Sequence, residues 1–234
     1  DARGFIADPR HRNALEYSGE LYLMKGDLDK AQARLATLKG SILSDTAHYG
    51  AALEQLLQAQ AWALDSADSK LSIYAESMIG RILVLTGRYD EAAIVLDRCI
   101  DQARRMWTAF LPWPQSFRAE ADLLLGHIDE AADRFENAFA LGCQLADPCW
   151  EGIAGRGLGL IAGARGDVQG GYTILLDTLQ RCMRLPDAYV WGSGYVMDGL
   201  SSSPNPTKTG IITTTGQNSA APNGVILALF DNAA

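Results

Sequence analysis

Apolar residues recur at helical spacing through most of this chain. In the stretch IGRILVLTGRYDEAAIVLDRC (79–99), two amphipathic segments flank a short polar turn. Gly87 ends the first segment, and two small residues, Gly80 and Ala92, stand where the segments would touch. A period of 3.6 residues with glycine at the end of the first segment predicts a hairpin of two packed helices.

The same pattern predicts further helices on either side of this hairpin. We expect helix pairs at 71–85 with 89–107, 114–125 with 128–145 and 148–165 with 168–185, preceded by a long helix at 47–66. Glycines mark the three turns, at Gly87, Gly126 and Gly166. Repeated hairpins cannot bury their apolar faces alone, so they predict an all-α solenoid.

The front of the chain departs from this regular order. Residues 14–38 form another predicted hairpin, with helices of about 12 residues on either side of Gly26. The gap from Gly26 to Gly87 is 61 residues, whereas the later turn glycines are about 40 apart. The helix at 47–66 therefore lacks a first partner, and either an insertion or a fusion near 39–47 would explain this.

We expect four regions along the chain: an arm at 1–12, a hairpin at 13–40, a helical array at 41–200 and an irregular tail at 201–234. The tail is rich in Ser, Thr, Asn, Pro and Gly, and its only charged residues are Lys208 and Asp231. A helix at 187–200 is expected to lack a second partner, and the apolar piece at 225–230 is expected either to cap it or to be an aggregation-prone β segment.

The spacing of small and large residues resembles two known repeat families. Gly80 and Ala92 stand where the tetratricopeptide (TPR) repeat keeps small residues, and Leu96 stands at its large apolar position. Residues 14–38 also resemble a TPR hairpin. Residues 47–200 resemble the helical-repeat region of LuxR- or MalT-like ATPase regulators, through YAESMIGRILVLTGRYDEAAIVLDRCI and LPDAYVWGSGYVMDGL. The resemblance implies a right-handed α-solenoid of TPR-like helix-turn-helix repeats. Neither the family's nucleotide-binding domain, with its GxxxxGK[ST] motif, nor its DNA-binding helix-turn-helix is found in the sequence, so the regulators' ATPase and DNA-binding activities are not implied.

Charge and hydropathy narrow the range of partners. The net charge is −8 and no stripe of Lys and Arg is visible, which argues against nucleic acid. No apolar run is long enough for a membrane helix, and no secretion signal is evident. Four separated cysteines without a CxxC motif favour reduced, buried thiols in a cytoplasmic protein, and only Cys143 and Cys149 are placed to form a disulfide.

The chain offers few groups for catalysis or metal binding. The histidines His11, His48 and His127 have no partner at i+3 or i+4, so we expect no metal. The acidic pairs Asp90-Glu91 and Asp129-Glu130 lie at helix starts, where capping is the expected role. The glycines of GIAGRGLGL (152–160) predict close helix packing rather than a nucleotide site. We therefore expect neither enzymatic activity nor a cofactor.

The resemblance to TPR arrays implies a groove lined by the first helix of each pair. The corresponding positions here are Tyr74, Ser77, Arg81, Trp113, Ser116, Glu120, Ile153 and Arg156. Such a groove suits a protein or peptide segment with apolar and acidic side chains. Alternatively, Trp113 packs across the LPWP bend. The alternative function is the ligand-sensing or self-association region of a bacterial regulator.

Overall fold

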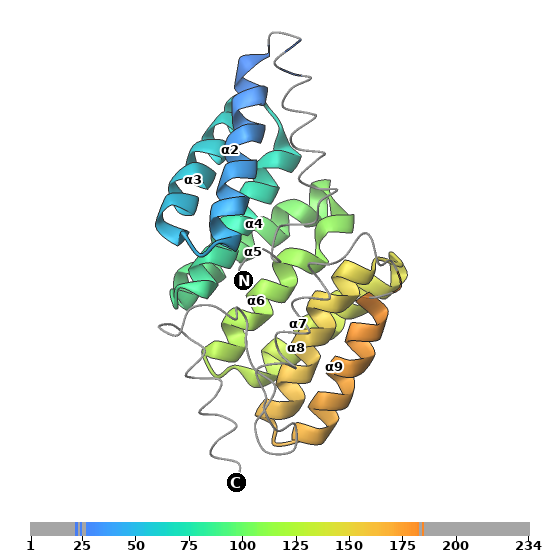
Figure 1. The fold of residues 1–234 in the computed structure, drawn as a ribbon. Coiled ribbons are helices and arrows are strands. Elements are labelled where there is room, and N and C mark those ends of the chain that lie inside the picture. The colour runs from blue at the N-terminus through green and yellow to red at the C-terminus, as the bar shows by residue number, and fades with distance from the viewer. Residues whose placement is uncertain (1–21, 23, 25–26, 183, 185–234) are drawn as a thin grey trace.

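The computed structural model describes Tyr22, Met24, residues 27–182 and Arg184. Within residues 27–182 it contains eight α-helices, one 3-10 helix and no strand, which confirms an all-helical fold (Figure 1). In chain order they are α2 (Leu28–Asp45), α3 (Tyr49–Asp65), α4 (Ser69–Leu85), α5 (Tyr89–Met106), η2 (Thr108–Phe110), α6 (Pro112–Leu124), α7 (Ile128–Gln144), α8 (Pro148–Ala164) and α9 (Val168–Cys182). The predictions for the arm, for the first half of the 13–40 hairpin and for residues 185–234 lie outside the described residues.

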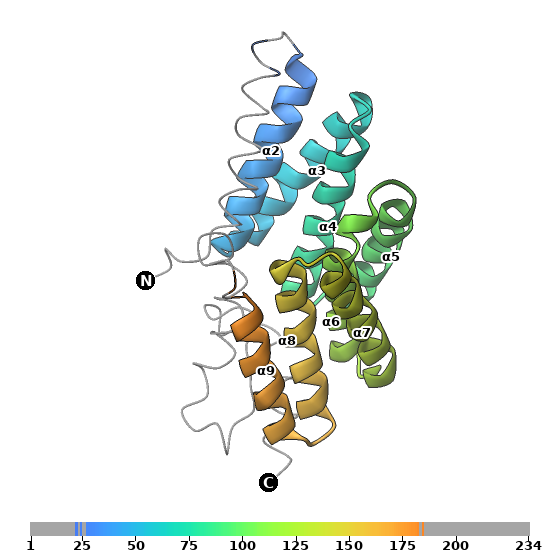
Figure 2. The same ribbon diagram turned by 90° about the vertical axis from the view of Figure 1, so that its right-hand side faces the viewer.

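The helices predicted from periodicity at 47–66 and from residue 71 onward are confirmed, each beginning and ending within three residues of the expected position. Consecutive helices pack against each other along the chain. In addition, α2 contacts α4, α4 contacts α6 and α6 contacts α8. We call these four helices the first-helix layer (Figure 2).

Burial differs strongly between first and second helices. Every residue of α4 from Leu71 to Leu85 is buried, because α2, α3, α5 and α6 all pack against this helix. The second helix α5 buries only five residues, along one face. The first-helix layer is therefore the most enclosed part of the described chain.

Each pair repeats one contact between a small and a large residue. The small residues of the first helices are Gly40, Gly80, Ala119 and Gly159, and 16 residues after each comes a large residue that is at most 1% exposed: Leu56, Leu96, Phe135 and Leu175. A Cβ atom on Gly80 would lie 2.5 Å from Leu96 Cδ2, so the glycine permits the close approach of α4 and α5.

This repeat begins with α2 and α3, which corrects the prediction that the helix at 47–66 lacks a partner. The partner is α2, which runs to Asp45 instead of ending near Leu38. The boundary expected between residues 40 and 41 falls within this helix. Gly40 is the contact point of the first pair, where a Cβ atom would lie 2.6 Å from Leu56 Cγ.

Six turns between helices hold one residue in the left-handed region: Ala47 (φ 62°), Ala67 (φ 55°), Gly87 (φ 78°), Gly126 (φ 87°), Ala146 (φ 51°) and Gly166 (φ 88°). Neighbouring turns are 20 residues apart, except for the 39 residues from Gly87 to Gly126, where η2 intervenes. The stretch from residue 27 to Gly87 thus holds three helices, α2, α3 and α4, each followed by a three-residue turn. The spacing of glycines did not reveal the turns at Ala47 and Ala67, because alanine is common inside helices and does not indicate a turn.

The variant Ala67→Gly should raise the free energy of unfolding by up to about 1 kcal/mol, because a side chain strains the backbone at φ 55°. Urea denaturation followed by circular dichroism measures the change. The matched control is Ala61, which is exposed inside α3. Ala61→Gly should lower stability by about 1 kcal/mol, because glycine disfavours a helix interior. Changes of the same sign in both variants would contradict the expectation.

The connection between α5 and α6 departs from the three-residue turns elsewhere. Here η2 holds an aromatic cluster, in which Trp107 stacks on Phe110 with ring centroids 4.3 Å apart. Phe110 also lies 5.9 Å from both Tyr74 and Trp150, measured between centroids. The buried apolar residues form two clusters, a larger one centred on α2–α6 and a smaller one on α6–α9. The η2 connection therefore belongs to the larger cluster and precedes α6, the helix that contributes residues to both clusters.

Candidate functional site

The eight residues predicted to line a groove all lie in the first-helix layer. Tyr74, Ser77 and Arg81 are on α4, Trp113, Ser116 and Glu120 on α6, and Ile153 and Arg156 on α8. None is more than 8% exposed. The structure therefore places them on three adjoining helices and encloses their side chains.

Four ionisable side chains of alternating sign cross this layer: Asp45, Arg81, Glu120 and Arg156. Arg81 Nη1 lies 3.0 Å from Asp45 Oδ1 and donates to Ser44 Oγ at 2.9 Å. Arg156 donates to both Glu120 oxygens, at 3.1 and 3.4 Å. We call these four residues the charge row. Burial of an isolated charge costs several kcal/mol, so pairing between helices explains how the layer tolerates them.

Burial raises the pKa of the Glu120 carboxyl above its ordinary value, while the charges of Arg156 and Arg81 oppose that rise. A pKa that is higher in the folded chain than in the unfolded one gives stability that is present at low pH. This stability is lost as the pH rises through the folded-state pKa. Protonation of Glu120 would leave the charge row with two positive groups and one negative group.

The other predicted residues contribute hydroxyl groups and aromatic rings. The hydroxyls of Ser77 and Ser116 donate within their own helices, to Tyr74 O at 2.6 Å and to Pro112 O at 2.7 Å. The Tyr74 hydroxyl lies 3.4 Å from Ser41 Oγ of α2. These contacts satisfy hydroxyl groups that are almost fully buried.

Trp113 lies in the first turn of α6 and packs against other aromatic rings. Its ring meets Phe117 edge-on at 4.9 Å and Trp150 at 5.9 Å between centroids. Trp150 belongs to α8 and also contacts Phe110 of η2. The aromatic rings therefore connect α6, α8 and the η2 connection beside the predicted groove residues.

Sequence reasoning missed Asp45 and Ser44, because the helix that carries them was expected to end earlier. A regular spacing could have revealed the pairing. Asp45 and Arg81 are 36 residues apart, and so are Glu120 and Arg156. Successive first helices are about 40 residues apart, and 36 residues is this repeat minus one helical turn of about four residues. The two partners therefore lie on the same face of successive first helices.

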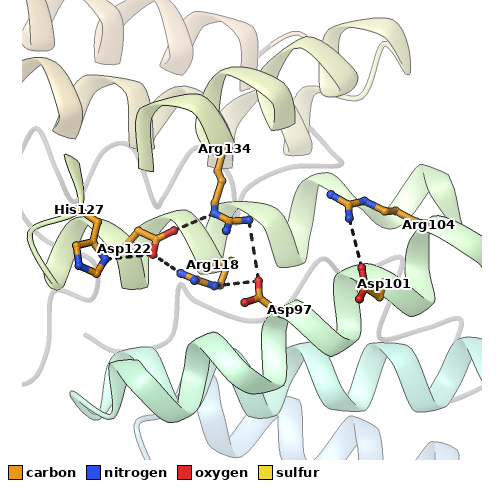
Figure 3. Close-up of polar contacts among 7 residues, drawn as sticks. All are labelled: Asp97, Asp101, Arg104, Arg118, Asp122, His127 and Arg134. Carbon is orange, nitrogen blue, oxygen red and sulfur yellow. Dashed lines mark hydrogen bonds and ion pairs between the residues drawn. The ribbon is translucent and has the colours of Figure 1, made fainter. Parts of the chain in front are cut away.

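A second polar network joins α5, α6 and α7 (Figure 3). Asp122 of α6 is almost fully buried and accepts hydrogen bonds from Arg118 and, at 2.9 Å, from Arg134 Nε. Asp97 of α5 lies 3.0 Å from Arg118 Nε, and His127 Nδ1 lies 3.8 Å from Asp122 Oδ1. Arg118 and Arg134 each contact both Asp122 and Asp97, so the network links the three helices and we interpret it as structural.

Two more buried carboxylates tie first helices to second helices. Glu76 of α4 pairs with Arg98 of α5, and burial raises the pKa of this carboxyl. Glu151 of α8 lies 3.1 Å from Arg181 Nη1 and 2.5 Å from Arg184 Nη2. Glu76 faces an arginine of α5, and Glu151 faces Arg181 of α9 and Arg184 just beyond it, so both carboxylates hold helix pairs together.

The acidic pairs at helix starts do not cap, which corrects the sequence-based expectation. The N-cap residues of α5 and α7 are Arg88 and His127, without a capping side-chain hydrogen bond. Glu91 pairs with Arg88, and Asp129 lies 2.7 Å from Arg165 Nη2. Side chains that do accept hydrogen bonds from backbone N–H groups at helix starts are those of Asp27 on α2, Asp68 on α4, Asp147 on α8 and Asp167 on α9.

The glycines of 152–160 pack closely, as predicted. A Cβ atom on Gly155 would lie 2.5 Å from Thr178 Oγ1, and one on Gly159 would lie 2.8 Å from Leu175 Cγ. A Cβ atom on Gly157 would overlap the Phe135 ring. These glycines therefore let α8 approach both α7 and α9.

The four cysteines are free thiols. Burial raises the pKa of Cys182 to about 12 and also raises that of Cys99, which disfavours the reactive thiolate. Within the described part of the chain, no group of three or more His, Cys, Asp or Glu side chains could hold a metal ion. In the same residues no helix has the length and apolar character that would carry it across a bilayer.

A scan against protein-family models finds no match, and a search of curated proteins finds none either. The resemblance to TPR repeats and to LuxR- or MalT-like regulators therefore stays a prediction, and function is argued from the geometry above.

Proposed function

We propose that this chain is a non-enzymatic interaction module of the cytoplasm that binds a segment of another protein along its first-helix layer. In this proposal the four helix pairs stack as a right-handed superhelix of the TPR type, with the layer on the concave side. The observation that carries the proposal is the recurrence of one residue order on successive first helices. Tyr74, Ser77 and Arg81 on α4 correspond to Trp113, Ser116 and Glu120 on α6.

Members of each corresponding pair are 39 residues apart, so an aromatic ring, a hydroxyl group and a charge follow one another at the same helix positions. On α8, Ile153 and Arg156 take up the first two positions. Aromatic and arginine side chains are the usual anchors of protein interfaces. An extended segment crossing these helices would meet apolar surface, hydrogen-bonding groups and charges in turn.

The charge row supports a role beyond holding helices together. Buried ion pairs can often be replaced by apolar residues of similar size without loss of stability, so packing alone does not require them. Because the eight side chains are buried, a partner segment would replace contacts that now enclose them. Binding would then be coupled to a local rearrangement of the chain.

A phage-displayed library of random peptides selects binders, and variants then locate the binding surface. Trp113→Ala and Arg156→Ala should each weaken binding of a selected peptide at least about tenfold. Arg104, exposed on α5 and paired with Asp101 at 3.3 Å, provides the control Arg104→Ala, which should leave binding unchanged (Figure 3).

Loss of folding would imitate loss of binding, so Arg156→Lys is tested as well. This variant keeps the charge but cannot reproduce the two-pronged contact with Glu120. It should bind more weakly while its circular dichroism spectrum stays that of the parent. Binding that survives both alanine variants would show that the first-helix layer is not the binding surface.

The enclosure of the charge row favours a second candidate, the ligand-sensing region of a bacterial regulator. Arg81 and Arg156 flank Glu120 in an enclosed layer, a setting that suits a small polar molecule. In a thermal-shift screen with a library of such molecules, a shift beyond ~2 °C that is lost in Arg156→Lys would favour this candidate.

A further inference from the structure

The charge row is electrically balanced and enclosed. Asp45 and Glu120 are its negative members, and Arg81 and Arg156 are its positive members. All four side chains are at most 4% exposed. An uncompensated charge is strongly disfavoured in such surroundings. A further charge can therefore enter the row only if another charge in it is neutralised.

Glu120 is surrounded by groups from three other helices. Arg156 of α8 donates to both of its oxygens, and the charge of Arg81 on α4 also acts on it. Burial and then the charge of Glu120 raise the pKa of Tyr89 above its ordinary value, so this phenol on α5 stays neutral. Among the described residues of α7 and η2, none contributes a charge that shifts the pKa of Glu120. The proton balance around Arg156 therefore depends on Glu120.

The contact between Arg156 and Glu120 has the two-pronged form by which a guanidinium recognises a carboxylate. A partner segment with an acidic side chain would compete with Glu120 for this contact. Two ionised carboxylates in one enclosed site repel each other, which raises the pKa of one of them. Burial already raises the pKa of Glu120, so Glu120 is the carboxylate that takes up a proton in this competition.

We propose that the first-helix layer recognises its partner segment through one side-chain carboxylate, which replaces Glu120 at Arg156 while Glu120 takes up a proton from solvent. The row then again holds two negative and two positive charges. Glu120 thus acts as an internal carboxylate that occupies the place of the partner's carboxylate. This inference rests on the proposed function and adds to it the chemistry of the partner and a dependence on pH.

The exchange makes the affinity depend on pH in a defined direction. One proton is taken up for each segment bound, so the dissociation constant should rise about tenfold per pH unit above the folded-state pKa of Glu120. Below that pKa Glu120 is already protonated, and this dependence disappears. An acidic segment should therefore bind more tightly as the pH falls, until its own carboxylate becomes protonated.

Isothermal titration calorimetry of the full chain counts the protons. The probe is a peptide selected from the displayed library, synthesised with a C-terminal amide so that only its side chains carry carboxylates. Titrations in phosphate and in Tris, two buffers with different enthalpies of ionisation, give the number of protons taken up. Between about pH 6 and pH 9 the uptake should rise from near zero towards one. The peptide with Asn or Gln in place of its acidic residue should bind at least about tenfold more weakly and take up no proton.

Glu120→Gln keeps the shape of the side chain and removes its titration. This variant should bind the acidic peptide without proton uptake and with nearly constant affinity from about pH 6 to pH 9. The matched control is Glu76→Gln, because Glu76 is also fully buried with a raised pKa but pairs with Arg98 of α5. It should leave the uptake unchanged, and circular dichroism verifies that both variants fold.

Three results would each overturn this inference: selected peptides without an acidic residue, no proton uptake across this pH range, or a Glu120→Gln variant that keeps the parent's pH dependence. The proposed function would survive any of them, provided that Trp113→Ala and Arg156→Ala still weaken binding. Binding that withstands both alanine variants would instead remove the proposed function itself, whatever the proton uptake.

Discussion

The variant Arg156→Met is expected to lower the free energy of unfolding by about 3 kcal/mol near pH 8, because it leaves the Glu120 carboxylate buried without its partner at 3.1 Å. Both side chains are only 4% exposed, so water does not replace the lost contact. Urea denaturation of the parent and the variant measures the difference.

The loss should depend on pH. Arg156 lowers the pKa of Glu120 against the effect of burial, so its removal raises that pKa further. A raised folded-state pKa favours folding below the ordinary pKa of glutamate, and this advantage fades as the pH rises through the raised value. The loss should therefore be smaller at pH 5 than at pH 8, and equal losses at the two pH values would contradict this account.

Two further variants separate the buried charge from the loss of side-chain volume. Glu120→Gln in the Arg156→Met background should recover part of the stability, because no charge is then left unpaired. The matched control is Arg165→Met. Arg165 lies 2.7 Å from Asp129, also 36 residues away, but the Asp129 side chain is 89% exposed. This variant should lose less than about 1 kcal/mol.

The variant Gly157→Ala is expected to lower the free energy of unfolding by about 2 kcal/mol. The new Cβ atom would overlap three atoms of the Phe135 ring, which is 1% exposed and lies in a close-packed interior. Overlap with a buried aromatic ring lies at the upper end of overpacking costs, about 3 kcal/mol, and the gain of about 1 kcal/mol in helix propensity offsets only part of it. Thermal and urea denaturation both report the change.

Gly50 and Phe135 provide the controls. A Cβ atom on Gly50 of α3 would meet nothing within 4 Å, so Gly50→Ala should be neutral or stabilising by less than about 1 kcal/mol. Phe135→Leu should cost less in the Gly157→Ala background than in the parent, since it relieves the overlap. If Gly157→Ala behaved like Gly50→Ala, the packing between α7 and α8 would be looser than described.

The helices were predictable wherever glycine marked the turns between strongly periodic segments. For α4 to α9 the apolar period and the glycines at 87, 126 and 166 agreed, so the helix bounds followed. The end of α2 was predicted too early because the turn after it carries Ala47 in place of a glycine. An alanine with positive φ depends on its tertiary surroundings, which a local sequence pattern does not show. For this reason the sequence analysis did not recognise that the contact between Gly40 and Leu56 belongs to the same repeat as the later helix pairs.

The sequence predicted which helices carry the candidate residues, but it did not predict that their side chains are buried. The comparison with TPR hairpins placed Arg81, Glu120 and Arg156 on adjoining helices, as the structure shows. Their burial and the pairing of Arg81 with Asp45 arise from how close the first helices lie, which depends on tertiary packing. Helix position predicts which face a side chain shares, whereas its exposure depends on every neighbouring helix.

The small-against-large contacts between paired helices also bear on how the chain acquires its structure. Each joins residues only 16 positions apart, such as Gly80 and Leu96, and the pairs then contact neighbouring pairs. Closing short loops costs little chain entropy, so topologies with mostly local contacts fold fast for their size. Among the described helices α2 to α9, each packs on its sequence neighbours or on the next first helix, so synthesis can add one hairpin after another to a core that is already assembled.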